Sequence, residues 1–353
     1  MCAHDGKFLF QYRRYRLALR APVRTAHGVW TEREGVIVRL ERESGAVGYG
    51  EAAVLPWFGT ETVEAAEAAC REIGAEVRAE QMAALPATLP CLRNAMATAR
   101  RETEDASGAT ESAEEAGGRG EEPAYLGVAA LLPAGRAVLE AVRAKAEMGF
   151  RVFKWKVGVG DVADELGLLD DVCAVLPAGA KLRLDANGAW DRRKAERWLE
   201  RCADRPVEFV EQPVAADARG AEDLLRGLAE NFPTAIALDE SIAGDGDVER
   251  WVGAGWRGVF VVKPSLLADV GGAVAKLSKA KAAVVFSSAL ETAVGAKAAL
   301  RVAFAWRGEP RALGFGVWPL FVDARCDGPM AVPFVRREDV ERLNAEAVWN
   351  AVS

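Results

Sequence analysis

Five short apolar runs in this sequence end in charged residues, and the order of those charges is what could carry chemistry. The runs VFKWKV, LRLDAN, EFVEQP, IALDES and VFVVKP supply, in turn, Lys154 and Lys156, Asp185, Glu211, Asp239, and Lys263. Oxygen ligands suit Mg²⁺, and a lysine beside a cation or another lysine can lose its proton near neutral pH. If the runs lie side by side as strands, the pattern predicts an enzyme that removes a proton and stabilises the resulting anion on a metal.

Each motif also has a structural interpretation of its own. An Asp-Ala-Asn-Gly segment is common in turns, Glu-Gln-Pro is common at strand ends, and Lys-x-Lys is common on a solvated edge. The joint order favours a site, because all of these charges close strands in consecutive units. Lys154 and Lys156 should point to the same side, where mutual repulsion should lower the pKa of at least one. Asn187 and Glu240 are expected either to support the site or to be a turn residue and a helix cap.

Residues 123–325 repeat one arrangement, a short apolar run followed by an amphipathic helical stretch. Eight such runs, ending with the weak RALGFG, predict an α/β fold, a modified (β/α)7β TIM-type barrel. Strands that are apolar nearly throughout are typical of sheets covered on both faces. In such barrels the active site lies at the carboxyl ends of the strands, which is where the charges fall.

The first 122 residues predict a separate α+β capping domain. Residues 8–53 alternate as in an antiparallel sheet, and a helix is expected over residues 62–79. Residues 101–122 have almost no apolar side chain, which predicts a disordered acidic loop at the domain boundary. Residues 326–353 form a C-terminal segment that returns to a helical pattern from Phe334 onward, and we expect it to pack back on the cap.

Composition excludes several classes of function. The chain of 353 residues is 50% hydrophobic and carries a net charge of −7, so it lacks the basic footprint of a nucleic-acid-binding protein. No uncharged run approaches a membrane span, and the six scattered cysteines have no zinc-ligand spacing. With only two histidines, histidine-based catalysis has almost no candidates. We expect a cytoplasmic enzyme acting on a small-molecule carboxylate, and the sequence does not indicate its oligomeric state.

Together these residues resemble the enolase superfamily, in the branch of the muconate lactonizing enzyme. Within that branch, the segments KWKVGVGD, LRLDANGAW, FVEQPV, LDESI, VVKPSLL and FSSALETAVG are most similar to those of the o-succinylbenzoate synthases. The resemblance covers nearly the whole chain. It implies Mg²⁺-dependent syn dehydration of 2-succinyl-6-hydroxy-2,4-cyclohexadiene-1-carboxylate to 2-succinylbenzoate, a step in menaquinone or phylloquinone biosynthesis.

The resemblance also implies a role for each charged residue. Lys156 would be the general base, Lys263 would stabilise the enolate from the opposite face, and Lys154 would assist. A lysine base combined with Mg²⁺ is a known pairing in this superfamily. The metal, Mg²⁺ with Mn²⁺ as a substitute, would be held by Asp185, Glu211 and Asp239.

Further positions match substrate contacts and cap loops of the family. Ser287, Ser288 and Gly314, at the ends of the last two strands, would contact the succinyl part of the substrate. Cap loops at residues 21–30 and 55–60 would close over the substrate and exclude water.

Two alternatives remain beside dehydration. A dipeptide epimerase or N-acylamino acid racemase would use Lys156 and Lys263 as bases on opposite faces of one carbon. Dipeptide epimerases of this branch generally carry an Asp-x-Asp element at the final strand, whereas this chain has no carboxylate from RALGFGVWP onward until Asp323. A non-catalytic barrel would be expected to lack a ligand or a lysine of the pattern, and none is missing.

Overall fold

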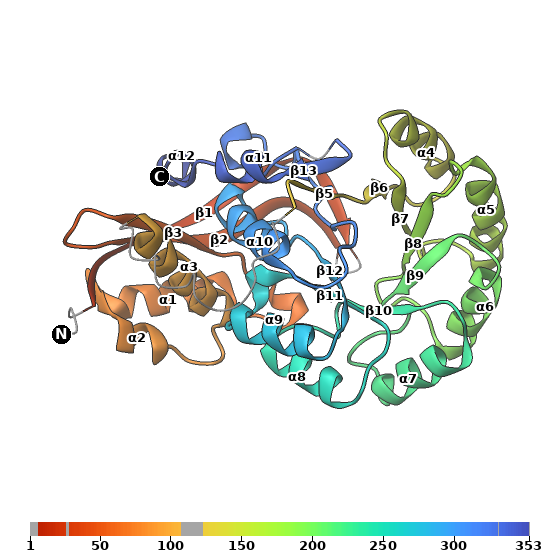
Figure 1. The fold of residues 1–353 in the computed structure, drawn as a ribbon, viewed down its shortest axis with the longest axis horizontal. Coiled ribbons are helices and arrows are strands. Elements are labelled where there is room, and N and C mark those ends of the chain that lie inside the picture. The colour runs from red at the N-terminus through yellow and green to blue at the C-terminus, as the bar shows by residue number, and fades with distance from the viewer. Residues whose placement is uncertain (1–5, 26–27, 107–122, 331, 353) are drawn as a thin grey trace.

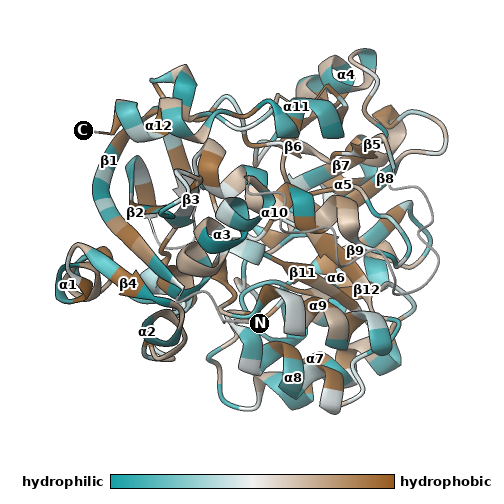
Figure 2. Cartoon of the chain, turned by 60° about the vertical axis from the view of Figure 1, so that its left-hand side comes forward, coloured by the Kyte–Doolittle hydropathy of each residue, from teal (hydrophilic) through white to brown (hydrophobic). Residues whose placement is uncertain are grey.

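The chain forms a curled parallel sheet surrounded by helices, with an antiparallel cap beside it (Figure 1). The computed structural model describes residues 6–25, 28–106, 123–330 and 332–352. In Figure 2 the hydrophobic colour gathers on the barrel strands, whereas the outer helices carry hydrophilic faces. Among the described residues, no helix combines the length and the apolar character needed to cross a membrane.

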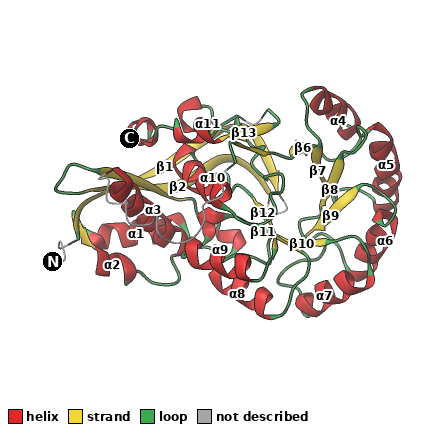
Figure 3. Ribbon diagram, viewed as in Figure 1, coloured by secondary structure: helices red, strands yellow, loops and turns green. Residues whose placement is uncertain are grey.

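Seven parallel strands build the barrel, in the spatial order β12-β11-β10-β9-β8-β7-β6. Their bounds are β6 (Ala130–Leu132), β7 (Val152–Lys156), β8 (Lys181–Asp185), β9 (Val207–Glu211), β10 (Ile236–Leu238), β11 (Val259–Val262) and β12 (Ala283–Phe286). The helices that cover them are α4 (Val138–Glu147), α5 (Val162–Val175), α6 (Arg192–Cys202), α7 (Ala221–Asn231), α8 (Asp245–Gly253), α9 (Val270–Lys279) and α10 (Ala293–Ala305) (Figure 3). This α/β architecture is the predicted one.

The eighth predicted strand is present only as a pair of bridges. Within residues 311–316, Leu313 pairs with Val128 and Gly314 pairs with Ser287, both in parallel, and these bridges join the two edges of the sheet. A side chain at Gly314 would place its Cβ 2.9 Å from the Ser287 Cβ, so the close approach requires glycine. A glycine-rich run offers few side chains to pack, which explains why the barrel closes through single bridges.

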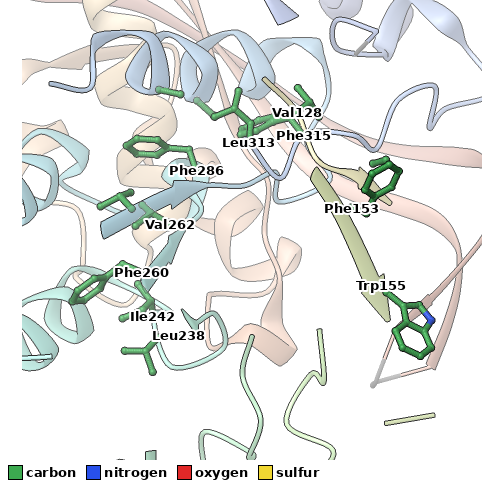
Figure 4. Close-up of a cluster of buried hydrophobic side chains, with 14 of the residues drawn as sticks. Val128, Phe153, Trp155, Leu238, Ile242, Phe260, Val262, Phe286, Leu313 and Phe315 are labelled. Atoms are coloured by element: carbon green, nitrogen blue, oxygen red, sulfur yellow. The ribbon is translucent and has the colours of Figure 1, made fainter. Parts of the chain in front are cut away.

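Alternation on β7 determines which side chains face the barrel interior. Phe153 and Trp155 are fully buried between the sheet and its helices, where Trp155 meets Trp198 of α6 with ring centroids 6.3 Å apart. Figure 4 shows these two side chains within the hydrophobic core, which also receives residues of the closing segment. Since neighbouring residues on a strand point to opposite faces, Lys154 and Lys156 face the interior.

The cap is a four-stranded antiparallel sheet in the order β3-β2-β1-β4, packed against helices. Its elements are β1 (Lys7–Thr25), β2 (Gly28–Glu41), β3 (Val47–Ala52), the 3-10 helix η1 (Pro56–Phe58), α1 (Val63–Ile73), β4 (Glu76–Arg78), α2 (Ala79–Ala83) and α3 (Pro90–Ala106). Helix α3 packs so closely against β3 that a Cβ at Gly48 or Gly50 would collide with the α3 backbone.

The helix expected over residues 62–79 is shorter in the structure. Helix α1 begins after Thr62, whose side chain accepts a hydrogen bond from Ala65 N, and it ends at Ile73. Gly74 then adopts a φ of 81°, which a helix does not allow. Residues 76–78 pair instead with the start of β1. The expected helix is therefore wrong from Gly74 onward, because residues 76–78 pair with β1 instead of continuing the helix.

The predicted acidic loop at residues 101–122 is wrong for its first part, which is helical. Its first six residues belong to α3, which continues to Ala106. Contacts with the sheet explain this extension: Thr103 is fully buried, and the backbone N–H of Tyr49 donates to Glu102 Oε2 at 2.9 Å. The rest of the predicted loop, residues 107–122, lies outside the described residues.

The C-terminal segment contacts both the cap and the strand that precedes the first barrel strand. Strand β13 (Phe334–Arg336) pairs antiparallel with β5 (Tyr125–Gly127), followed by α11 (Arg337–Glu341) and α12 (Ala345–Ala351). On α12, the Trp349 ring lies 6.0 Å from the Tyr49 ring of the cap and stacks under the Arg13 guanidinium at 4.4 Å. Short 3-10 turns, η3 (Pro264–Leu266) and η4 (Ala324–Cys326), complete the described elements.

Candidate active site

The charged strand ends meet inside the barrel. Lys154 Nζ lies 2.6 Å from Glu211 Oε1 and 3.0 Å from Asp185 Oδ2. Asp185 is the register partner of Glu211 and of Lys156, so three neighbouring strands present these groups at one level. Lys263 and Asp239 form an ion pair on the next two strands around the sheet. All of these carboxylates are buried.

Burial and crowding set the charge balance of this cluster. Burial raises the pKa of Glu211 to about 8; Lys154 opposes that shift, and the nearby Asp185 and Asp239 add to it. Burial alone would lower the pKa of Lys154, but Asp185, Glu211 and Asp239 outweigh it and raise that pKa. Lys154 is therefore not the lysine whose pKa the mutual repulsion lowers, because three carboxylates surround its amine; the expectation that one of the two has a lowered pKa stays a prediction. Desolvation opposes ionisation of Asp185, yet the lysines lower its pKa.

The donor set fits a hard cation, although the carboxylates do not form a preassembled ligand cluster. In the part of the chain that the structure describes, no three His, Cys, Asp or Glu side chains stand together in a metal-binding arrangement. Lysine amines explain this, since Lys154 lies against Glu211 and Asp185, and Lys263 lies against Asp239. Burial raises the pKa of Glu211, and the neighbouring carboxylates of Asp185 and Asp239 add to that shift, so another positive charge would stabilise the ionised cluster. The metal-ligand assignment stays a prediction.

Lys156 is oriented by a short chain of side chains. Its amine donates to Asn187 Oδ1, and Asn187 Nδ2 donates to Glu240 Oε1 at 3.1 Å. Asn187 has a φ of 43°, in the left-handed region that Asn tolerates better than most residues. Burial, then Asp239 and Asp185, raise the pKa of Glu240 to about 7. Asn187 thus fills both expected roles, since it lies in a turn and contacts Lys156, and Glu240 reaches the site through Asn187.

The cap reaches Lys263. Its Nζ lies 4.3 Å from the centroid of the Phe58 ring, and Phe58 belongs to the cap loop at residues 55–60. The other predicted cap loop, residues 21–30, is mostly a hairpin between β1 and β2, with residues 26–27 outside the described residues. Trp30, on the β2 arm of that hairpin, packs edge-on against Trp57 with ring centroids 5.5 Å apart. Closure of either loop over a substrate stays a prediction.

The three predicted substrate contacts lie together at the barrel seam. Ser287 Oγ donates to Gly314 O at 3.3 Å, and the backbone N–H of Ser288 donates to the same oxygen at 3.2 Å. The Ser288 hydroxyl also bonds Glu291 Oε2 at 3.1 Å. Burial raises the pKa of Glu291 to about 7; its own backbone N–H opposes that shift, and Glu51 adds to it.

Leu131 is a site residue that the sequence did not reveal. It is the register partner of Lys154 on β6, so it shares the interior face, and it is 40% exposed although it lies on a barrel strand. Its signal was hidden because the run YLGVAALL is apolar on both faces. Only the pairing with Lys154 distinguishes Leu131 from its buried neighbours. A separate cavity of about 710 Å³, between α3, α9 and α10, contains none of the predicted catalytic residues.

Comparisons with known proteins agree with this architecture and site. An enolase C-terminal domain-like family model matches residues 137–332, and a model of the MenC N-terminal domain matches residues 9–103. The o-succinylbenzoate synthase of Thermosynechococcus vestitus is 40% identical over 316 residues, which are 87% of this chain and 92% of the relative. The chain belongs to the o-succinylbenzoate synthase family. The predicted family, fold class and hydro-lyase function are confirmed.

Other relatives agree with membership in the o-succinylbenzoate synthase family. The Edwardsiella ictaluri o-succinylbenzoate synthase is 30% identical over 307 residues. The crystal structure of the enzyme from Thermosynechococcus elongatus BP-1, described as complexed with Mg in the active site, has a TM-score of 0.75. It is 36% identical and covers 97% of this chain and 99% of its own. A dipeptide epimerase from Enterococcus faecalis V583, at 22% identity and a TM-score of 0.77, shares the fold.

Proposed function

We propose that this chain dehydrates 2-succinyl-6-hydroxy-2,4-cyclohexadiene-1-carboxylate to 2-succinylbenzoate with Lys156 as its base. The observation that carries the proposal is the placement of two amines on opposite walls of the barrel interior. Lys156 ends β7 and Lys263 follows β11, with β8, β9 and β10 between them. In a closed barrel of eight positions, strands four apart face each other across the interior. A carbon held between them therefore has one amine on each face.

Lys156 would move the proton. Its amine, held by Asn187, would take the proton from the carbon that bears the substrate carboxylate. The same amine would return a proton to the hydroxyl group as it leaves from that face, which accounts for a syn elimination. Lys263 would stabilise the developing negative charge from the other face, and Phe58 keeps water from one side of its amine.

Asp185, Glu211 and Asp239 would hold a divalent cation, Mg²⁺ with Mn²⁺ as a substitute. When bound, the cation would neutralise the substrate carboxylate while the adjacent proton is removed. Lys154 would assist by balancing the charge of Glu211 and Asp185, with which it already pairs. The Mg complex of the T. elongatus relative supports this assignment.

The residues of the barrel interior also suit an amphipathic carboxylate. Leu131 offers an apolar contact for the substrate ring beside the lysines, and Ser287, Ser288 and Gly314 would bind the succinyl part. These contacts require no macromolecular partner. A cytoplasmic location also stays a prediction.

Replacing Lys156 with Ala tests the proposal. Loss of the base should lower kcat by about 100- to 10,000-fold while Mg²⁺ affinity changes little, measured by absorbance assay and titration calorimetry. The matched control is Lys276→Ala, because Lys276 of α9 is exposed and forms a salt bridge with Glu249 of α8, far along the chain from the strand-end charges. Near-normal turnover by Lys156→Ala would remove this residue from the mechanism. Turnover of dipeptides or N-succinylamino acids, without dehydration, would favour epimerisation or racemisation.

A further inference from the structure

We propose that Arg33, on cap strand β2, is a positioning residue that sets the substrate-binding loop at residues 287–290 against the cap loop at residues 55–60. This inference rests on the proposed roles of Ser287 and Ser288 in substrate binding. Arg33 itself touches no catalytic lysine or carboxylate in the contacts that the structure describes. Its effect would pass through the backbone that it holds.

One guanidinium joins three segments of the chain. Arg33 Nε donates to Leu290 O and Nη2 donates to Ala289 O, both at 3.2 Å. Nη1 donates to Val54 O at 2.8 Å. Arg33 is only 3% exposed, so water does not compete freely for these bonds. A planar group with several fixed donors can hold several carbonyls in one geometry, which a lysine cannot do.

The loop needs such support because its backbone is strained. Leu290 has a φ of 60°, in the left-handed region that a bulky residue rarely adopts. Such a conformation persists only where the surroundings fix it. Arg33 fixes the carbonyls of Ala289 and Leu290 from the cap side. From the barrel side, Glu291 accepts hydrogen bonds from the Ser288 hydroxyl and from Ala289 N.

The contact with Val54 carries the same support to the other side of the site. Val54 directly precedes the cap loop, whose Phe58 covers Lys263. A displacement of Arg33 would therefore change the loop that would bind the succinyl group and the loop above Lys263 together. The metal ligands on β8 to β10 make no contact with Arg33 among the described hydrogen bonds and ion pairs. Substrate affinity should thus depend on Arg33, whereas Mg²⁺ affinity should not.

Arg33→Lys and Arg33→Met test this separation. We expect both to raise KM about tenfold or more while kcat changes less than about threefold, and to weaken binding of 2-succinylbenzoate by the same factor as KM. Mg²⁺ affinity, measured by titration calorimetry, should stay unchanged. The matched control is Arg39→Met, because Arg39 lies on the same strand, is half-buried and contacts Glu41 and Gln11 of the cap sheet rather than the loop at residues 287–290. Adding methylguanidinium to Arg33→Ala should restore KM.

Hydrogen exchange provides a readout that needs no substrate. Exchange in peptides covering residues 284–292 should rise in Arg33→Lys and stay unchanged in Arg39→Met. A merely structural role would lower kcat, substrate affinity and Mg²⁺ affinity together, without rescue by methylguanidinium, and that result would overturn the proposal. Unchanged KM and unchanged exchange would overturn it as well. A wild-type protein that does not dehydrate the cyclohexadiene carboxylate would instead contradict the proposed function, while the exchange result would still decide the role of Arg33.

Discussion

At the level of single residues, amines and carboxylates of the site satisfy one another. Lys154 pairs with Glu211 and Asp185, and Lys263 pairs with Asp239. A cation that binds here must therefore compete with lysine amines for the same oxygens. Binding of the cation would release Lys263 from Asp239, which makes its amine available to the substrate. The proposed metal site would therefore couple metal binding to the availability of the Lys263 amine through Asp239.

Asp239→Asn should weaken Mg²⁺ binding strongly. The substitution removes one anionic oxygen from the proposed ligand set, and we expect affinity to fall about tenfold or more in titration calorimetry. Asp223→Asn, at an exposed position in the first turn of α7, is the matched control. Equal Mg²⁺ affinity in wild type and Asp239→Asn would contradict the ligand assignment.

Glu291 should make stability fall as pH rises. Its pKa is raised from 4.5 to about 7, mainly by burial, so between these values the folded protein holds a proton that the unfolded chain has lost. The contribution of Glu291 to the free energy of unfolding is therefore largest below about pH 4.5, falls between about pH 4.5 and pH 7, and stays constant at higher pH. The total fall in the free energy of unfolding across this pH range is on the order of 3 kcal/mol at most.

Urea unfolding at several pH values measures this contribution. Glu291→Gln cannot ionise, so its stability should fall less than that of wild type between pH 5 and pH 8. Glu230→Gln, at an exposed position on α7, should keep the wild-type slope. Parallel pH profiles for wild type and Glu291→Gln would remove this group as the cause.

The sequence predicted that the strand-end charges meet inside the barrel, because the alternation of side chains along a strand determines which face each residue points to. It did not predict that Lys154 sits among three carboxylates, since that depends on side-chain conformations rather than on strand order. Arg33 escaped prediction for another reason: its partner Leu290 is 257 positions away along the chain. Contacts between an arginine and backbone carbonyls leave no motif in a single sequence.

At the level of elements, the sequence-based predictions were wrong at the ends of two helices, α1 and α3. Gly74 inside an amphipathic pattern was compatible with a longer helix, and only pairing with β1 shows that the chain turns there. The acidic residues at the end of α3 suggested a loop, yet Glu102 accepts a backbone hydrogen bond from β3. Both errors occur where a neighbouring element outweighs local preference.

Gly314→Ala should disturb the site through the barrel seam. The added Cβ would lie 2.9 Å from the Ser287 Cβ, so one of the two segments must move. We expect a loss of about 1–3 kcal/mol in the free energy of unfolding and a higher KM, measured by urea unfolding and steady-state kinetics. Gly167→Ala on α5, where nothing lies within 4 Å of the added atom, should leave KM unchanged and should not destabilise. Equal KM and equal stability in Gly314→Ala would show that the seam tolerates displacement.

At the level of the whole molecule, cap and barrel are joined by buried polar contacts. Glu51 of β3 accepts hydrogen bonds from Tyr15, Thr292 and Gly295, and so places a carboxylate at the N-terminus of α10. Asn94 of α3 donates to the carbonyls of Pro264 and Leu267 next to Lys263. The cap therefore takes part in shaping the barrel loops.

Glu51→Gln should weaken this junction. Hydrogen bonds to a charged group contribute about 1.5–3 kcal/mol each. Because a glutamine can still accept some of these bonds, we expect a loss of about 1–3 kcal/mol in the free energy of unfolding. Urea unfolding followed by fluorescence and by circular dichroism measures the loss and shows whether cap and barrel still unfold together. With Glu230→Gln as the control, an unchanged midpoint for Glu51→Gln would show that the junction does not depend on this carboxylate.

The barrel wall is weakest where it closes through isolated bridges instead of a full strand. Along residues 311–316 a few backbone hydrogen bonds replace a full strand ladder, so thermal fluctuations should part the wall there before they part β7 to β11. Breathing at this point would separate Ser287 from Gly314 while the lysines keep their places. Such a wall can widen for an entering ring or a departing product without dismantling the groups that move the proton.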